Sequence, residues 1–151
     1  MILPARTISL ILLVAIPVAA GCSGGSSQQR GGSSQHLSPT PAAAARAFAL
    51  DLTYLHGRAA STRLVSSVAP LRPSVVDMVK DFRGHKAVIT KTTRVKPNLF
   101  AYRIYGHGPG KRPFFKTEMF TGLLNVTVAR DGESWGVSAV ELTDMRWSAV
   151  P

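Results

Sequence analysis

The fold is decided by the run LNVTVARDGESWGVSAV, residues 124–140. Apolar side chains at Leu124, Val126 and Val128 alternate with more polar ones, which indicates a strand with one buried face. Asp131-Gly132 is a strong signal for a two-residue hairpin turn. A second strand is expected from Trp135 through Leu142, so the run predicts an antiparallel hairpin.

The chain before this hairpin contains further strand patterns. Residues 87–96 are rich in Val, Ile and Thr, and residues 99–105 follow them after a Lys-Pro-Asn turn. A basic, glycine-rich loop is expected at 106–113. Beyond it, residues 114–120 and 123–130 read as strands on either side of a bulge at Gly122. These patterns predict an antiparallel sheet of about four strands.

Helical spacing dominates the region before residue 84. Thr40 is a good N-cap and Pro41 a good first residue for a helix over 42–56, which Gly57 is expected to end in a left-handed turn. We expect Trp135 of the sheet to pack against this helix. The apolar face of the helix consists of Ala45, Phe48, Leu52 and Leu55.

Weaker signals follow that helix. Residues 59–69 suggest one or two helical turns, and Pro70 and Pro73 predict a break. Another short helix is expected from Pro73 through Phe82, with Gly84 stopping it. The whole pattern predicts an α+β domain with N-terminal helices packed on a curved antiparallel sheet.

This order of elements resembles the NTF2-like (cystatin-like) superfamily over most of residues 41–145. A long first helix bearing Phe48 and Tyr54, shorter helices and a sheet closing with the Asp-Gly-x-x-Trp hairpin carry the resemblance. It implies helices cradled in a cone-shaped sheet. The chain is most similar to small secreted or lipid-anchored bacterial proteins, including the periplasmic domains of VirB8-like secretion components, which act as assembly modules.

The N-terminal segment ends in Val18-Ala19-Ala20-Gly21-Cys22, which resembles the bacterial lipobox. The resemblance implies a signal peptide over 1–21 and a diacylglyceryl group on Cys22, although the family prefers leucine where Ala19 stands. The uncharged stretch from Ile8 to Ala20 has 13 residues, whereas a membrane-spanning helix needs about 20. An ordinary secretory signal or an uncleaved anchor is the alternative, but neither explains the position of the cysteine.

Residues 22–37 are expected to be the lipidated cysteine and a Gly/Ser/Gln-rich tether, whose 14 residues after the cysteine would have a root-mean-square reach of about 20 Å. Residues 38–151 form one domain. Cys22 is the sole cysteine, so no disulfide is available to the domain. We therefore expect an extracytoplasmic protein anchored by lipid to the cell membrane, or to the outer membrane of a two-membrane organism.

Positive charge is concentrated between Phe82 and Thr117, a segment without an acidic residue. The rest of the mature chain is neutral, so this segment carries its whole excess of charge. Outside a cell membrane, the expected partners are anionic lipid headgroups, wall polymers or an acidic envelope protein, rather than nucleic acid. The nine basic residues are Arg83, Lys86, Lys91, Arg94, Lys96, Arg103, Lys111, Arg112 and Lys116.

Residues for catalysis are harder to find. Tyr54, Tyr102 and Glu118 could line a pocket inside the cone, but no catalytic residue is predicted. The four histidines lack the spacing of metal ligands, and no metal or other cofactor is expected. A non-catalytic assembly or interaction module is therefore the first hypothesis. A binder of a small apolar ligand in the cone, or an enzyme like ketosteroid isomerases or SnoaL-like cyclases, is the alternative.

Overall fold

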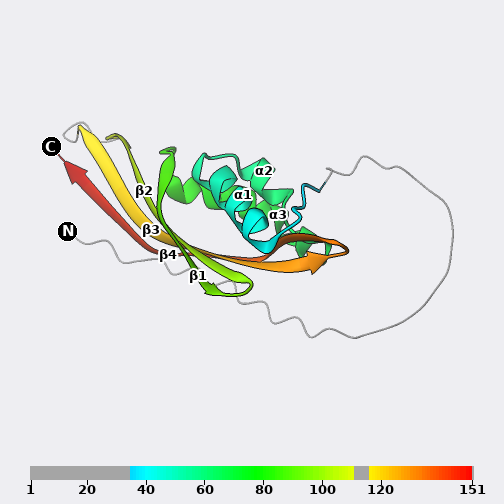
Figure 1. Ribbon diagram of the computed structural model, residues 1–151. Helices are drawn as coiled ribbons and strands as arrows, with labels where there is room; N and C mark the ends of the chain where they lie inside the picture. Colours follow the sequence, from blue (N-terminus) through cyan, green and yellow to red (C-terminus); the bar gives the residue numbers. More distant parts are fainter. Residues whose placement is uncertain (1–34, 111–115, 151) are drawn as a thin grey trace, which may run out of the picture.

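The computed structural model describes residues 35–110 and 116–150. Within them the fold is α+β, with an antiparallel sheet in the order β1-β2-β3-β4. Figure 1 shows the helices gathered on one face of this sheet, while the far ends of β2, β3 and β4 extend past them. The elements are α1 (Pro41–Thr53), α2 (Gly57–Ser61), η1 (Ser66–Leu71), α3 (Arg72–Met78), η2 (Val79–Phe82), β1 (Ala87–Lys96), β2 (Leu99–Pro109), β3 (Thr117–Asp131) and β4 (Ser134–Val150).

Strands β2 and β3 show the alternation expected from the sequence. Phe100, Tyr102 and Ile104 are buried on the helix-facing side of β2, whereas Arg103 is exposed on the other side. Two boundaries differ from the prediction, because β2 continues through Pro109 into the expected loop and β4 runs to Val150. Backbone pairing between neighbouring strands extends these elements beyond their apolar positions.

The predicted irregularity at Gly122 is present, but β3 is one continuous strand. Thr121 pairs with Arg146 and Leu123 with Thr143, so the extra residue of the bulge lies in β4. A Cβ on Gly122 would stand 2.6 Å from Met145 Sδ. The Met145 side chain of the bulge therefore lies directly against the backbone of Gly122.

Helix α1 begins as expected, with the Ala43 amide donating to Thr40 Oγ1 at 3.2 Å. Its end differs from the prediction, because α1 stops at Thr53 and Leu55 takes the left-handed conformation (φ 67°). Gly57 instead starts α2, where its added Cβ would stand 2.5 Å from Val79 Cγ2. Gly57, which was expected to end the first helix in a turn, therefore allows α2 and α3 to pack closely.

The second helical region is also rearranged. Pro70 lies inside η1 rather than breaking a helix, and the predicted helix over 73–82 is α3 followed by η2. Arg83 and Gly84 both have positive φ (51° and 82°), which ends η2 as expected and turns the chain into β1.

Helix α1 packs against all four strands. Trp135 packs at the border of the core and is only partly buried, with the Arg130 guanidinium 5.3 Å from its ring centroid. Its backbone also pairs with Ser38, through N···O distances of 2.7 and 2.9 Å. Trp135 therefore closes one end of the core rather than filling its centre.

The last residues of the expected tether lie against the domain. Gln35 Nε2 donates to Leu64 O at 3.3 Å, and the His36 amide donates to Thr62 O at 3.1 Å. Cys22 and the rest of the signal and tether segments lie outside the described residues. No helix of the described part is long and apolar enough to span a bilayer.

Candidate functional site

The space between α1 and the sheet is filled by side chains. Phe48 and Leu52 from α1 meet Tyr102, Leu124 and Val126 from the sheet, and each is at most 1% exposed. Burial raises the pKa of Tyr102 to about 12, against the opposing effect of the Arg46 charge. The space around Tyr102, which was expected to be the interior of a cone, is therefore filled by the hydrophobic core.

The three predicted pocket residues do not meet. Tyr54 follows α1 and is 45% exposed, with Lys86 Nζ 5.8 Å from its ring centroid. Tyr102 pairs with Leu124 on β3, six residues along that strand from Glu118. Six residues of strand span about 20 Å, so Tyr102 and Glu118 cannot line one small pocket.

Glu118 instead meets His85, which comes from the turn before β1. The two residues are 7% and 6% exposed, and His85 Nε2 lies 3.5 Å from Glu118 Oε2. Neither of these two atoms has a hydrogen bond within the described residues. A buried ionisable group without a good partner is costly, so each of these groups depends on the other.

An aromatic cluster surrounds this pair. The Phe120 ring stacks on Trp147 at 4.7 Å and meets Phe82 edge-on at 5.5 Å. The centroids of the His85 and Trp147 rings lie 5.9 Å apart, and the Arg83 guanidinium lies 4.2 Å from the Trp147 ring centroid. Arg83 is therefore held locally as a cation over an aromatic face.

The missing side chain of Gly108 leaves room for the His85 ring. A Cβ on Gly108 would overlap His85 Nδ1, so the imidazole lies directly on the backbone of β2. The pair thereby links the start of β1 to β2 and β3. Chemically, it can share a proton or form an ion pair, and its visible consequence is to fix this end of the sheet.

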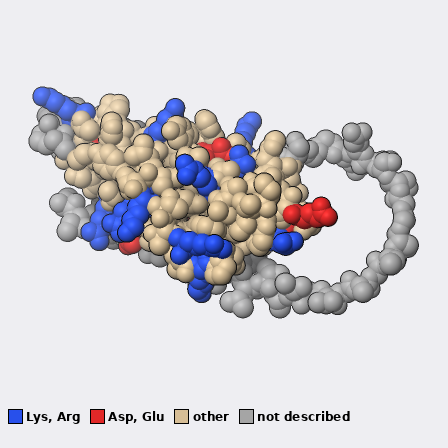
Figure 2. Space-filling view, viewed as in Figure 1, with Lys and Arg blue, Asp and Glu red and all other residues tan. Residues whose placement is uncertain are grey.

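Those basic residues between Phe82 and Thr117 that the structure describes lie in separate places. Arg83 and Lys86 lie over Trp147 and Tyr54, whereas Lys91, Arg94 and Lys96 lie along β1. Figure 2 shows blue groups over the tip of the β1–β2 hairpin, separated by uncharged surface from those elsewhere on this face. Lys116 is exposed just before β3, while Lys111 and Arg112 lie outside the described residues.

The densest part of this charge is the β1–β2 hairpin. Lys91 pairs directly with Arg103 across the two strands, and both are exposed on the sheet face opposite the helices. Like charges directly opposite each other in a sheet are destabilising. Arg94 Nη2 donates to Pro97 O at 2.9 Å, and Val95 beside it is 53% exposed at the hairpin end.

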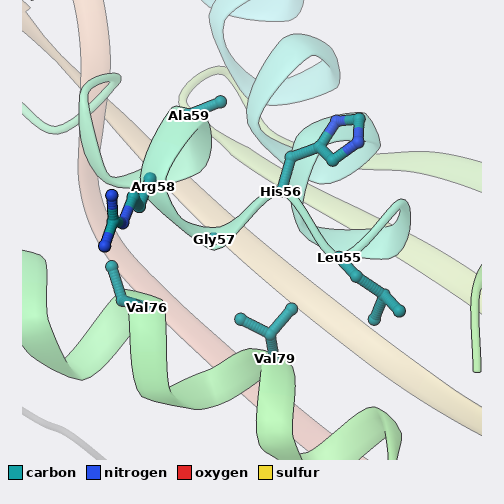
Figure 3. A pocket seen from close by; sticks show the side chains of 7 residues that line it. All are labelled: Leu55, His56, Gly57, Arg58, Ala59, Val76 and Val79. Atoms are coloured by element: carbon teal, nitrogen blue, oxygen red, sulfur yellow. The ribbon is translucent and has the colours of Figure 1, made fainter. Parts of the chain in front are cut away.

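A hollow of about 490 Å³ lies elsewhere, between α2 and α3. Figure 3 shows Val79 of η2 pointing toward Gly57, and the His56 ring turned away from both valines. No pattern in the sequence predicted this hollow or the contact between His85 and Glu118. Both depend on how the helices and the turn before β1 are set on the sheet. The hollow is lined by Leu55, His56, Gly57, Arg58, Ala59, Val76 and Val79.

Comparison with protein-family models, curated proteins and solved structures finds no match to this chain. Among the described residues, no three His, Asp, Glu or Cys side chains are grouped so that they could hold a metal ion. The features that bear on the function of the protein are the charged hairpin, the filled core and the sequence of the N-terminal segment.

Proposed function

We propose that the chain is a bacterial lipoprotein whose extracytoplasmic domain is a non-catalytic interaction module, and that its β1–β2 hairpin binds an anionic surface of the envelope. The lipobox-like run ending in Cys22 supports the anchor, which would hold the domain within about 20 Å of the bilayer. The arrangement of helices on one face of a four-stranded antiparallel sheet supports an NTF2-like assignment.

One observation carries the binding proposal, namely that Lys91 lies opposite Arg103 on the uncovered face of the sheet. Folding places two like charges side by side, and an anion bound between them would relieve the repulsion. Arg94 and Lys96 add positive charge toward the hairpin end. Asp51 and Asp77, two of the acidic residues of the domain, are engaged by Arg63 and Lys80 instead.

The filled space between α1 and the sheet supports a non-catalytic role. Substrate must reach a positioned acid or base, and Tyr102 is sealed among Phe48, Leu52 and Leu124. The His85–Glu118 pair is also more than nine-tenths buried. These facts favour a protein that works through its surface.

The binding proposal is tested by sedimenting residues 22–151, carrying Cys22→Ser, with vesicles. Binding to phosphatidylglycerol vesicles should weaken steeply as salt rises, and phosphatidylcholine vesicles should bind little. Because each basic residue near an anionic membrane adds about 1 kcal/mol, Lys91→Glu plus Arg103→Glu should weaken binding at least about tenfold.

The matched control is Lys80→Glu plus Arg130→Glu, which makes the same change in net charge at residues outside β1 and β2. Equal losses in both double variants would show that net charge alone matters and would exclude the hairpin as the binding face. A parallel variant, Lys111→Glu plus Arg112→Glu, tests the loop between β2 and β3. Binding that ignores salt contradicts the electrostatic mechanism.

The anchor is tested separately with the single substitution Cys22→Ser. Two acyl chains hold a protein stably on a membrane, whereas one chain is marginal. The wild-type protein should fractionate with membranes and show a diacylglycerol adduct on Cys22 by intact mass, and the variant should be released. A wild-type mature protein without lipid on Cys22 would disprove the anchor.

A further inference from the structure

A buried glycine, Gly57, is one of the residues that line the hollow between α2 and α3. At Gly57 a Cβ would stand 2.5 Å from Val79 Cγ2 and 3.1 Å from Val76 Cα, so the two helices could not approach this closely with any larger residue. The side chains of Leu55, Val76 and Val79 are left only partly buried around it. The result is an apolar floor that the rest of the domain does not cover.

The size of the hollow suits a small molecule. Its volume is about 490 Å³, and pockets for small organic ligands commonly measure about 300–1,000 Å³. An entire protein face could not enter a hollow of this size between two short helices. By its size, the hollow therefore fits a small organic molecule.

Charge at the hollow comes from Arg58 of α2, which lines it beside the apolar floor. Figure 3 shows its side chain extending from α2 toward the side of Val76. Within the described residues, Arg58 has neither an ion pair nor a side-chain hydrogen bond, and no carboxylate lines the hollow. Asp77, which follows Val76 in α3, is engaged by Lys80 Nζ at 2.6 Å.

We propose that this hollow binds a small amphipathic carboxylate with one hydrocarbon chain. The chain would lie against Leu55, Val76 and Val79, and the Arg58 guanidinium would donate hydrogen bonds to the carboxylate. Because Arg58 is exposed to solvent, a neutral apolar molecule would gain no ion pair from it, and a cationic one would be repelled by it. The site is separate from the β1–β2 hairpin and does not depend on the function proposed for that hairpin.

Octanoate is the probe, titrated into the Cys22→Ser protein and followed by amide NMR. Shifts should centre on Gly57, Val76 and Val79, and 1-octanol and octylammonium should bind at least tenfold more weakly. Arg58→Gln should raise the octanoate Kd at least tenfold. The control Arg146→Gln, which changes an exposed arginine of β4, should leave the Kd unchanged.

A second variant fills the hollow without disturbing the core. Ala59 lines the hollow but is exposed, so Ala59→Phe should fold normally and abolish octanoate binding. No octanoate shifts at these amides, or equal binding of octanoate and octylammonium, would overturn the proposal. An unchanged Kd in Arg58→Gln would overturn it as well.

Discussion

The buried pair of His85 and Glu118 yields the sharpest stability prediction. The side chain of each residue is more than 90% buried, and His85 Nε2 lies 3.5 Å from Glu118 Oε2. Removing one partner from a buried pair typically costs about 3–5 kcal/mol, whereas replacing both by apolar residues is often nearly neutral. Leucine is close in size to both side chains, so the substitutions mainly change polarity.

We expect His85→Leu to destabilise the domain by about 3 kcal/mol, because it leaves a carboxylate buried without a partner. Glu118→Leu should cost less, about 2 kcal/mol, since a lone imidazole can remain neutral. The double variant should cost only about 1 kcal/mol. Such a result means a coupling energy of about −4 kcal/mol (1 − 3 − 2), well above the usual error of additivity.

Urea denaturation followed by tryptophan fluorescence measures these differences. With a slope of about 2 kcal/mol/M, His85→Leu should lower the midpoint by about 1.5 M, and the double variant by about 0.5 M. Additive losses in the double variant would refute the reasoning. So would a cost below about 0.5 kcal/mol for either single variant, because the pair would then not be a buried, mutually dependent one.

Three further predictions follow from single contacts. Gly57→Ala should cost about 1–3 kcal/mol in thermal or urea unfolding, because its Cβ would overlap Val79, and a wild-type stability would contradict the tight α2–α3 packing. Burial raises the pKa of Tyr102 from 10.0 to about 12, so the Tyr102 hydroxyl loses its proton first in the unfolded chain, and the stability of the domain should fall as pH rises from 10 to 12. Tyr102→Phe should remove this part of the fall. The same alkaline stability profile in both proteins would refute the prediction. Asp131 accepts hydrogen bonds from the Ser66 amide and Oγ, both at 2.7 Å, and these bonds lower the pKa of its carboxyl group. The stability of the domain should therefore decline as pH falls below about 4. In thermal melts, Asp131→Ala should be less stable than the wild type near neutral pH and should lose less stability in acid.

Much of the architecture was predictable from local patterns. Alternation at Phe100, Tyr102 and Ile104 identified the buried face of β2, and the Asp131-Gly132 turn identified the β3–β4 hairpin. Thr40 and Pro41 identified the start of α1, which the hydrogen bond at 3.2 Å confirms. These features succeed because each depends on neighbours in sequence or on a simple period of burial.

Sequence and tertiary structure determined different things about this protein. The order of residues alone placed nine basic residues and no acidic one between Phe82 and Thr117, and the Cys22 run alone suggested an anchor. Only the fold decided that Lys91 faces Arg103, that Glu118 meets His85 rather than Tyr102, and that Gly57 lets α2 close on Val79. Such contacts depend on strand register and helix placement, which are set by packing between residues far apart in the chain.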